Sequence, residues 1–524
     1  MVMRPLVFCI LCLVFVGEVV AQPSIQWQKA LGGSEYESAR SVLQTIDGGF
    51  IATGEAESTD GDVVGNHGGT DIWVVKLDST GIVKWKKAYG GSDNEWANAI
   101  QQTSDNGFVV AGFTESNDGD VSGNHGDKDL WILKLDSEGV ILWQKTLGGS
   151  YWEEAWSVKQ TTDDGFILIG RANSIDGDVT GNNGSLDYWV VKLNSSGNLE
   201  WQKSLGGSGF DRGYAVSQTD DGGYIVVGES DSQDGDINTP LGSSDYWVVK
   251  LNFEGKIEWE KSLGGTNLDR GNDIQQTRDG GFIVFGQSGS TNGDVTENHG
   301  VYDCWAVKLS PNGTIEWQKA LGGSSYEFGQ SIKQTLDGGF ILLGFTTSND
   351  GDVVNNDGGA DMWVVKLTED GVLEWQKTLG GTSAERGFSI QQSIDGGYIV
   401  AGDTGSNDGD VSENHGQNDF WIVKLSPEST STSDLSAQHL QIYPNPAQNT
   451  ISILSAEVLT KKENSTGVQS LSIQITDLLG RVLSHQTISL DQSIDLSALP
   501  SGLYLLSAIT PDGAMLSGKF CKQD

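Results

Sequence analysis

Hydrophobic and polar positions recur along this chain with one fixed period, the spacing from Trp27 to Trp85. Each unit contains a tryptophan two residues before a lysine, and an earlier tryptophan within an apolar run. Neither series has an insertion or a deletion. The first series is Trp27, Trp85, Trp143, Trp201, Trp259, Trp317 and Trp375, and the second is Trp73, Trp131, Trp189, Trp247, Trp305, Trp363 and Trp421. Seven copies at one period are typical of a solenoid or a propeller.

Within each unit the pattern predicts four β-strands. In the first unit we expect them at Ala39–Thr45, Gly49–Gly54, Ile72–Leu77 and Ile82–Ala88. The dipeptides Asp47-Gly48 and Thr80-Gly81 predict tight turns, because glycine supplies the positive φ that short links between strands need. Four strands per repeat are typical of a propeller blade. The 3.6-residue period of a helical repeat is absent from every unit.

The phase of the repeat predicts how the ring closes. The segment Ile25–Leu31 has a fourth-strand pattern, whereas the last repeat ends at Phe420–Leu425 with a third-strand pattern. Joined, the two segments complete a seventh blade and leave no open sheet edge. The sequence therefore predicts an all-β fold, a seven-bladed β-propeller followed by a small β-sandwich domain.

The residues that recur in every unit are expected to serve the fold. We expect the fourteen tryptophans to pack between neighbouring blades. We expect the lysine stems at Lys29, Lys76 and their equivalents to cover these rings while the charges stay in water. The glutamines of the first strands are expected to bond to the backbone, and they are Gln44, Gln102, Gln160, Gln218, Gln276, Gln334 and Gln392.

The regions outside the repeats predict export. Residues 1–21 have a basic start, an apolar run and small residues before a cleavage point after Ala21, which is typical of a secretory signal peptide. The propeller is expected at 22–425. The polar segment 426–438 is interpreted as a linker, and a second domain is expected at 439–524. No other stretch is apolar enough for a transmembrane segment.

Motifs of the second domain carry a family resemblance. They are Tyr443-Pro444-Asn445-Pro446, Asp477-Leu478-Leu479-Gly480-Arg481, Leu499-Pro500-Ser501-Gly502-Leu503-Tyr504 and Lys519-Phe520. In this order they resemble the C-terminal sorting domain (type A) of proteins exported by the bacterial type IX secretion system. The resemblance implies that the secretion machinery is a partner and that the protein is secreted or attached to the outer surface, via the periplasm. The stretch Leu459–Gln469 is interpreted as a loop insertion.

The charge narrows the range of partners. Asp plus Glu number 71 and Lys plus Arg number 32, which gives a formal charge of −39. Such a surface repels nucleic acid and anionic membranes, and it favours solubility and cation binding. Two of the four cysteines lie in the signal segment, so a disulfide framework is not expected. The chain is expected to be a monomer.

Aromatic residues that break the repeat are the candidate ligand-binding residues. They occur at the entries of neighbouring first strands, beside an acid that follows the Gly-Gly link of each unit. The candidate set is Trp96, Tyr151, Trp152, Trp156, Glu95 and Glu153. These aromatic rings either form a platform for a sugar or a peptide or simply fill the ends of the blades. No catalytic residue is identified, because paired carboxylates are too abundant to distinguish a pair.

The long link between the second and third strands suggests calcium. Its oxygen-bearing side chains are spaced at relative positions 1, 3, 7 and 12, which resembles an EF-hand loop without its helices. The candidate ligands in the first three units are Asp60, Asp62, Asn66, Asp71, Asp118, Asp120, Asn124, Asp129, Asp176, Asp178, Asn182 and Asp187. The alternative is a set of turns whose side chains bond to local amides. The histidines at His67, His125, His299 and His415 are interpreted as turn residues.

Three functions remain open from the sequence. The first is a secreted or cell-surface binding protein for a glycan or protein ligand. The second is a glycan-active, endoglucanase-like hydrolase, because the repeats resemble those of exported bacterial proteins whose names suggest glycan hydrolysis. The third is a structural or adhesion component of the cell surface. The sequence favours binding over catalysis, because no unit contains a Ser-His-Asp arrangement, a reactive thiol or a phosphate loop.

Overall fold

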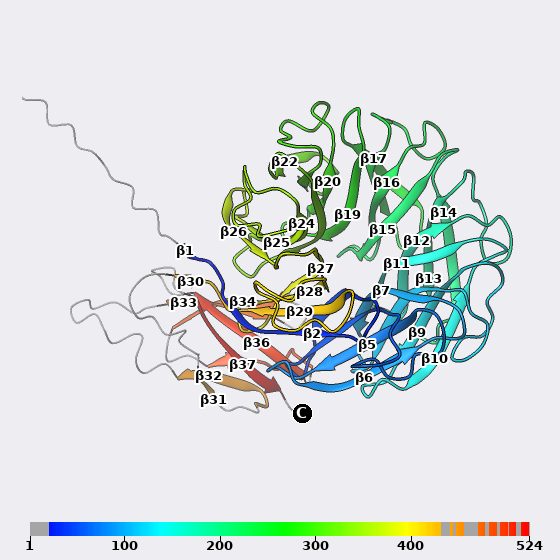
Figure 1. Cartoon of the computed structure of the whole chain (residues 1–524). Coiled ribbons are helices and arrows are strands. Elements are labelled where there is room, and N and C mark those ends of the chain that lie inside the picture. Colours follow the sequence, from blue (N-terminus) through cyan, green and yellow to red (C-terminus); the bar gives the residue numbers. More distant parts are fainter. Residues whose placement is uncertain are drawn as a thin grey trace, which may run out of the picture. The chain divides into compact units, whose positions relative to one another are not determined.

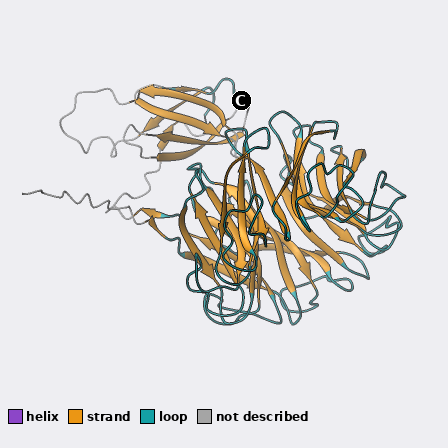
Figure 2. Ribbon diagram, turned by 90° about the horizontal axis from the view of Figure 1, so that it is seen from above, coloured by secondary structure: helices purple, strands orange, loops and turns teal. Residues whose placement is uncertain are grey.

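The computed structural model describes residues 20–430, 441–443, 447–454, 470–476, 482–489, 493–500, 502–509 and 515–522. Contacts between Cα atoms divide the chain into two units, Met1–Thr430 and Ser431–Asp524. The described residues form strands and loops only (Figure 2). No helix in this part of the chain is long and apolar enough to cross a membrane. Most of the predicted signal peptide and residues 431–438 of the predicted linker lie outside the described residues.

The first unit is built from seven antiparallel sheets of four strands (Figure 1). In the first blade the strands are β3 (Glu37–Gln44), β4 (Phe50–Ala56), β5 (Asp71–Leu77) and β6 (Val83–Tyr89). The two tight turns have the predicted positive φ, 81° at Gly48 and 82° at Gly81. The predicted four-strand blade is therefore confirmed, with boundaries that differ by one or two residues.

Five further blades repeat this order. Their strands are β7 (Glu95–Gln102), β8 (Phe108–Thr114), β9 (Asp129–Leu135), β10 (Ile141–Leu147); β11 (Glu153–Gln160), β12 (Phe166–Ala172), β13 (Asp187–Leu193), β14 (Leu199–Leu205); β15 (Asp211–Gln218), β16 (Tyr224–Ser230), β17 (Asp245–Leu251), β18 (Ile257–Leu263); β19 (Asp269–Gln276), β20 (Phe282–Ser288), β21 (Asp303–Leu309), β22 (Ile315–Leu321); β23 (Glu327–Gln334), β24 (Phe340–Thr346), β25 (Asp361–Leu367) and β26 (Leu373–Leu379).

The seventh blade joins the two ends of the repeat region. Its order is β2 (Ile25–Leu31), β29 (Asp419–Leu425), β28 (Tyr398–Thr404) and β27 (Glu385–Gln392). Ile25 pairs with Leu425 and Leu31 with Phe420, so the predicted closure is confirmed (Figure 1). A short pair, β1 (Val20–Ala21) with β30 (Ser429–Thr430), continues beside it. The predicted cleavage after Ala21 would remove β1.

Tryptophans hold neighbouring blades together, as expected. Each fourth-strand tryptophan packs edge-on against an aromatic ring of the next blade, with centroids 5.6–6.3 Å apart in all seven copies. The third-strand series is almost fully buried, and Trp73 packs against Phe420 of the seventh blade. Aromatic pairs with this geometry stabilise a core beyond their buried area. The hydrophobic core therefore lies between the blades.

The third-strand lysines correct an expectation. Lys76 and its equivalents at Lys134, Lys192, Lys250, Lys308, Lys366 and Lys424 are only 1–6% exposed, so their charges do not stay in water. Each ammonium instead binds the aspartate of the turn between the first and second strands, as Lys76 binds Asp47 at 2.9 Å. Burial alone would raise the pKa of Asp105, but Thr103, Lys134 and the Gly107 N–H lower it to about 2. The lysine therefore fixes a turn that lies far from it in the sequence.

The seven first-strand glutamines form a closed circle of hydrogen bonds. Each Oε1 accepts from a backbone N–H in the preceding blade, as Gln102 does from Ile46 at 2.8 Å. The circle continues through all units and ends where Gln44 accepts from Ile394 of the seventh blade at 2.7 Å. The predicted backbone role is confirmed, and it links blades as well as residues within one blade.

The second unit contains two small antiparallel sheets. Their strands are β31 (Gln441–Tyr443), β32 (Thr450–Leu454) and β35 (Ile494–Asp495), and β34 (Val482–Ser489), β33 (Ser470–Thr476), β36 (Gly502–Ile509) and β37 (Met515–Lys522). Ile451 and Ile494 of one sheet share a core with Ile473, Leu506 and Phe520 of the other. This is the expected sandwich. Residues 444–446, 477–481 and 459–469 of the predicted motifs and insertion lie outside the described residues.

Candidate functional site: the axial rim

The seven first strands surround the axis of the ring, and each carries a β-bulge at the same place. In the first blade Ala39 pairs with Gly54 and Ser41 pairs with Thr53, so Arg40 is the extra residue. A bulge kinks a strand and redirects the side chain of the extra residue. The seven extra residues differ from blade to blade, and they are Arg40, Asn98, Trp156, Tyr214, Asn272, Gln330 and Phe388.

A glycine opposite each bulge makes room for it. A Cβ added at Gly112 would lie 1.7 Å from the carbonyl oxygen of Trp96, and at Gly54 it would lie 1.9 Å from that of Ser38. No side chain fits at such distances, so every second strand keeps a glycine there. The bulge is therefore part of the repeated framework, although the residue that it presents is not.

We call the extra residues and the cross-strand pairs just before them the axial rim. These pairs also change from blade to blade. They are Ser38–Glu55, Trp96–Phe113, Glu154–Arg171, Arg212–Glu229, Arg270–Gln287, Phe328–Phe345 and Arg386–Asp403. The rim combines aromatic rings, guanidinium groups and carboxylates in an order that does not repeat, as a specific binding surface requires.

The predicted aromatic platform is partly assembled at the rim. Trp152 and Trp156 both donate from Nε1 to the carboxylate of Glu154, and Arg171 lies over the ring of Trp152 at 4.4 Å. Lys128 bridges Trp152 and Phe113, at 4.8 and 3.7 Å from the two ring centroids. Phe113 in turn contacts Trp96 at 5.4 Å. Trp96 and Trp152 are 37% and 36% exposed, so both side chains are partly open to solvent.

Tyr151 is 55% exposed and makes no ring contact with the other members of the platform. A second aromatic group lies in the sixth blade. Tyr326 stacks on Phe328 with 3° between the ring planes, and Phe328 stacks on Phe345 at 4.9 Å. This group could not be recognised from the sequence, because none of its residues is a tryptophan and Phe345 reaches Phe328 only through the pairing of two strands.

Arginine–carboxylate pairs occupy most of the remaining rim. Glu229 is 3% exposed in its side chain and binds Arg212 at 2.8 Å and Arg270 at 3.0 Å. Burial alone would raise the pKa of Glu229, but the two arginines lower it below its ordinary value. Arg386 binds Asp403 at 2.8 Å, and Asp403 also accepts from Tyr36. Arg40 binds Glu55 through Nε and Nη2.

Arginine is concentrated at this end of the molecule. The chain has eight arginines, and five of them belong to the rim, namely Arg40, Arg171, Arg212, Arg270 and Arg386. A protein with a net charge of −39 would surround a ligand with carboxylates at most places on its surface. The rim instead presents planar cations beside aromatic rings, and guanidinium groups suit bidentate recognition of polar ligands.

The two predicted acids are placed differently from the aromatic residues. Glu95 and Glu153 are 0% exposed. Glu95 accepts from the N–H of Gly91 at 2.7 Å and from the Thr114 hydroxyl at 2.6 Å. The acids that follow the Gly-Gly links are buried in all seven units, so they do not offer their carboxylates to a ligand. They hold together the loops behind the rim.

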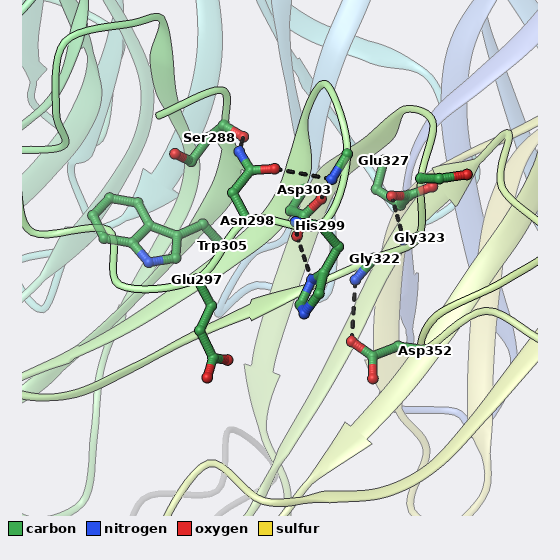
Figure 3. Close-up of polar contacts among 12 residues, drawn as sticks. Ser288, Glu297, Asn298, His299, Asp303, Trp305, Gly322, Gly323, Glu327 and Asp352 are labelled. Atoms are coloured by element: carbon green, nitrogen blue, oxygen red, sulfur yellow. Dashed lines mark hydrogen bonds and ion pairs between the residues drawn. The ribbon is translucent and has the colours of Figure 1, made fainter. Parts of the chain in front are cut away.

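The polar side chains of the long loops form hydrogen bonds within the loops and with the strands beside them. In the fifth unit, Asn298 donates to the carbonyl of Ser288, and both the N–H and Nδ1 of His299 contact Asp303 Oδ2, at 2.8 and 2.7 Å (Figure 3). The same histidine–aspartate pair occurs at His67, His125 and His415. The interpretation of these histidines as turn residues agrees with this arrangement.

The predicted calcium ligands of the first three units make hydrogen bonds or ion pairs with nearby groups of the protein. Asp60, Asp118 and Asp176 accept from the N–H of Ser34, Ser92 and Ser150. The asparagines Asn66, Asn124 and Asn182 donate to nearby carbonyls. Asp62 binds Lys86, whereas Asp120 and Asp178 accept from Gly90 and Gly148. Within the described ranges no group of three or more acidic, histidine or cysteine side chains is placed to hold a metal ion.

In six of the seven units, one carboxylate oxygen of the aspartate that begins the third strand nevertheless lacks a hydrogen-bond partner. Asp71, Asp129 and Asp187 are 0% exposed, and Oδ1 of each is buried without a hydrogen bond, as it also is in Asp245, Asp361 and Asp419. In the sixth unit Asp361 borders a polar pocket of about 180 Å³ together with Asp357 and Asp410. Burial, which is the largest cause, and Glu385, Asp357 and Asp410 raise the pKa of Asp361 to about 7. Burial likewise raises the pKa of Asp187 to about 7.

Comparison with known proteins identifies one region by family. Residues 441–522 match the model of the secretion system C-terminal sorting domain. This agrees with the type IX secretion motifs, and the protein is accordingly secreted or located at the cell surface.

The other similar proteins are distant. The regulatory protein FlaEY of Caulobacter vibrioides is 24% identical over 397 residues, which are 68% of this chain and 40% of that protein. Among solved structures, the extracellular domain of a proposed one-component system from B. thetaiotaomicron is 11% identical, with a TM-score of 0.41, covering 95% of this chain and 58% of the other.

Two hydrolases are also similar in structure. Puromycin hydrolase is 10% identical with a TM-score of 0.42 and coverage of 95% and 63%, and the phage phi92 endosialidase is 10% identical with a TM-score of 0.37 and coverage of 94% and 87%. Scores this low carry no argument about function. This chain spans less than two thirds of FlaEY, of the extracellular domain and of puromycin hydrolase.

Proposed function

We propose that the protein is a secreted or cell-surface binding protein and that the axial rim holds its ligand, a glycan or a protein segment. The observation that supports this proposal is the combination of exposed aromatic side chains and paired arginines at the part of the blade that varies. Six large aromatic side chains are exposed in the described part of the chain, and five lie at the rim end of the blades. These five are Trp96, Tyr151, Trp152, Phe210 and Tyr326.

The chemistry of the rim favours a glycan over a protein segment. The partly exposed rings of Trp96 and Trp152 suit the apolar faces of sugar rings. The buried Glu154 carboxylate beside them holds Trp152, Trp156 and Arg171 in place. Tyr326 and Phe328 supply a second stacking surface on another blade. Two such surfaces around one axis suit a ligand with several sugar units.

Binding is better supported than hydrolysis. Glycoside hydrolysis needs one carboxyl group that keeps its proton and one that is ionised. Two arginines lower the pKa of Glu229, which keeps this carboxylate in the charged form. The carboxylate of Glu154 is already bound by Arg171 at 2.8 Å and by the Nε1 groups of Trp152 and Trp156. The rim therefore has the groups to orient a sugar, and Glu229 is poorly suited to protonate a leaving group.

A glycan array with the mature full-length protein tests the proposal. We expect binding to a subset of glycans and a loss of about tenfold or more in affinity for Trp152→Ala, because one ring stacked on a ligand contributes on the order of 1–2 kcal/mol. Phe253→Ala is the matched control, since Phe253 is 66% exposed in the turn between β17 and β18. Its affinity should equal that of the parent protein.

Three outcomes would contradict the proposal. The first is a protein that binds no glycan and no protein partner, which favours a structural or adhesion role. The second is equal binding by Trp152→Ala and Phe253→Ala, which places the ligand elsewhere. The third is release of shortened sugars from a bound polysaccharide, which makes the protein a hydrolase. Circular dichroism of both variants shows whether each is folded.

A further inference from the structure

A second layer of side chains surrounds the axis near the other end of the first strands. It consists of the next-to-last residue of each first strand, and its members are Leu43, Gln101, Lys159, Ser217, Gln275, Lys333 and Gln391. We call it the donor layer. These strands contact one another in a closed circle, so the seven side chains share one level of the axis. The repeat does not dictate their identity.

The three glutamines of the donor layer have fixed orientations. Oε1 of Gln101 accepts from the N–H of Gln160 at 2.6 Å, and Gln391 accepts from Gln44 at 2.8 Å. Gln275 does the same with Gln334 at 3.2 Å. A primary amide whose oxygen is used in this way keeps two N–H donors. None of the three NH₂ groups has a hydrogen-bond partner among the residues that the structure describes.

The lysines of the layer outnumber the carboxylates near them. Lys333 binds Asp273 of the neighbouring strand, and Asp273 also accepts from the N–H of Ile332 at 2.9 Å and from Ser331 at 3.2 Å. Lys159 has no ion-pair or hydrogen-bond partner in the described part of the chain. Burial and the charge of Lys333 lower the pKa of Lys159 to about 8. The one nearby carboxylate is therefore already in use.

An unpaired lysine is unexpected in a chain with 71 acidic and 32 basic residues. A cation that loses much of its water without gaining a partner is costly, and the repeat supplies an aspartate for every buried third-strand lysine. At the donor layer the surroundings of Lys159 are mostly further donors, namely the ammonium of Lys333 and three amide groups, and the one carboxylate, Asp273, is bound to Lys333. What such a layer lacks is a second acceptor with negative charge.

We propose that the donor layer binds a small oxyanion, such as sulfate or phosphate, on the axis of the propeller. Lys159 and Lys333 supply the charge, and the NH₂ groups of Gln101, Gln275 and Gln391 supply directed hydrogen bonds. Charge-assisted hydrogen bonds of this kind are the stronger class. Lys333 keeps 34% of its side-chain area exposed, so the layer is open to ions from solution. This site is separate from the axial rim and does not depend on the glycan proposal.

Titration of the mature full-length protein with sodium sulfate tests the site, at constant ionic strength set by sodium chloride. We expect saturable binding by calorimetry and a rise in melting temperature with sulfate. For Lys159→Gln we expect affinity to fall at least tenfold, because the unpaired charge is lost. Lys256→Gln is the matched control, since Lys256 is 71% exposed in a turn and leaves the layer intact. It should bind sulfate like the parent protein.

Gln101→Glu provides a second test that keeps the size of the side chain. It replaces an NH₂ donor with a carboxylate that pairs with Lys159, so sulfate binding should disappear while the melting temperature is kept or raised. The proposal is overturned if Lys159→Gln and Gln101→Glu bind sulfate as the parent does. It is also overturned if sulfate and chloride have equal effects at the same ionic strength.

Discussion

The third-strand lysines and the bulge residues of the first strands behave in opposite ways. Lys76 and its six equivalents are all buried and all bind a turn aspartate, with Nζ to Oδ2 distances of 2.8–3.0 Å. The bulge at Arg40 recurs just as strictly, yet its seven residues include two asparagines, one arginine and three aromatic residues. In a repeat protein, identical interactions stabilise the scaffold, and a fixed backbone position with changing side chains is the place to look for recognition.

Removing the closing strand should produce the largest effect on the repeated part. A variant of the mature protein without residues 22–33 lacks β2, which buries Ala30 and Leu31 and provides the acceptor for Trp421 Nε1. We expect a loss on the order of 5–10 kcal/mol, comparable with the stability of a whole domain. Thermal unfolding followed by circular dichroism should show a melting temperature lower by tens of degrees or no cooperative transition.

A synthetic peptide of residues 22–33 should restore the transition of this variant, whereas a scrambled peptide of the same composition should not. A variant that melts like the parent protein would show that the ring does not depend on the pairing of Ile25 with Leu425.

Two sets of carboxyl groups with opposite pKa shifts predict a stability maximum in mild acid. Burial raises the pKa of Asp71 and Asp245 to about 6, and that of Asp187 to about 7. The stability that these groups contribute in the protonated form is therefore complete below pH 4 and is lost as the pH rises through 6–7. The turn aspartates have the opposite shift, with the pKa of Asp163 lowered to about 2, so their contribution is lost as the pH falls from 4 to 2. The melting temperature should therefore be highest near pH 4–5.

The double variant Asp187→Asn, Asp361→Asn sharpens this test. Asparagine keeps the acceptor and cannot ionise, so we expect a gain of roughly 1–3 kcal/mol at pH 8 and little change at pH 5. Asp370→Asn is the control, because Asp370 is exposed in a turn. A double variant that is no more stable than the parent at pH 8 would mean that these carboxylates already have a counter-charge.

Calcium should have the smallest effect on the melting temperature, and we expect it to bind the buried aspartates of the third strands. The partnerless oxygens of Asp71, Asp129 and Asp187 favour a cation, but the lack of a preformed ligand group among the described residues predicts weak binding. With a dissociation constant of about 1 mM, about 10 mM calcium stabilises each occupied site by about 1.4 kcal/mol. We expect a rise of a few degrees in melting temperature at pH 8 and less at pH 5, where protons compete.

Calorimetry of chelator-treated protein measures the same binding directly. Equal melting temperatures with and without calcium at this concentration and pH 8, together with no heat of binding, would leave the loop side chains with a turn role only. Magnesium at the same concentration controls for ionic strength.

The features of the fold that could be predicted from the sequence are those that the repeat determines. The blades, the pairing of β2 with β29 and the tryptophan contacts follow from residues that recur in every unit. The axial rim could not be predicted in the same way, because a bulge is a property of the register between two strands. Phe113, Arg171 and Glu229 became candidates only when the register placed them beside Trp96, Glu154 and Arg212.

Burial was the other quantity that the sequence could not supply. Lysine is rarely buried without a partner, and the partner of Lys76 lies in an earlier turn, at Asp47. A glutamate that follows a glycine link, such as Glu95, would be expected at the surface. Glu95 is buried instead, and its carboxylate accepts hydrogen bonds from the N–H groups of Gly91 and Ser116. In both cases a contact distant in the sequence reversed the local expectation.

The pairing of β2 with β29 also determines the order in which the propeller can assemble. The strand β2 is synthesised first, but its partner β29 lies at the far end of the repeat region. Ile25 can therefore pair with Leu425 only after all the repeats have been synthesised. Closing a loop of that length costs about 2 kcal/mol more than closing one of a single unit. Until then a growing chain has two unpaired strand edges, and neighbouring molecules compete for them. Biosynthesis must therefore keep the ends apart from other chains until the whole ring has been made.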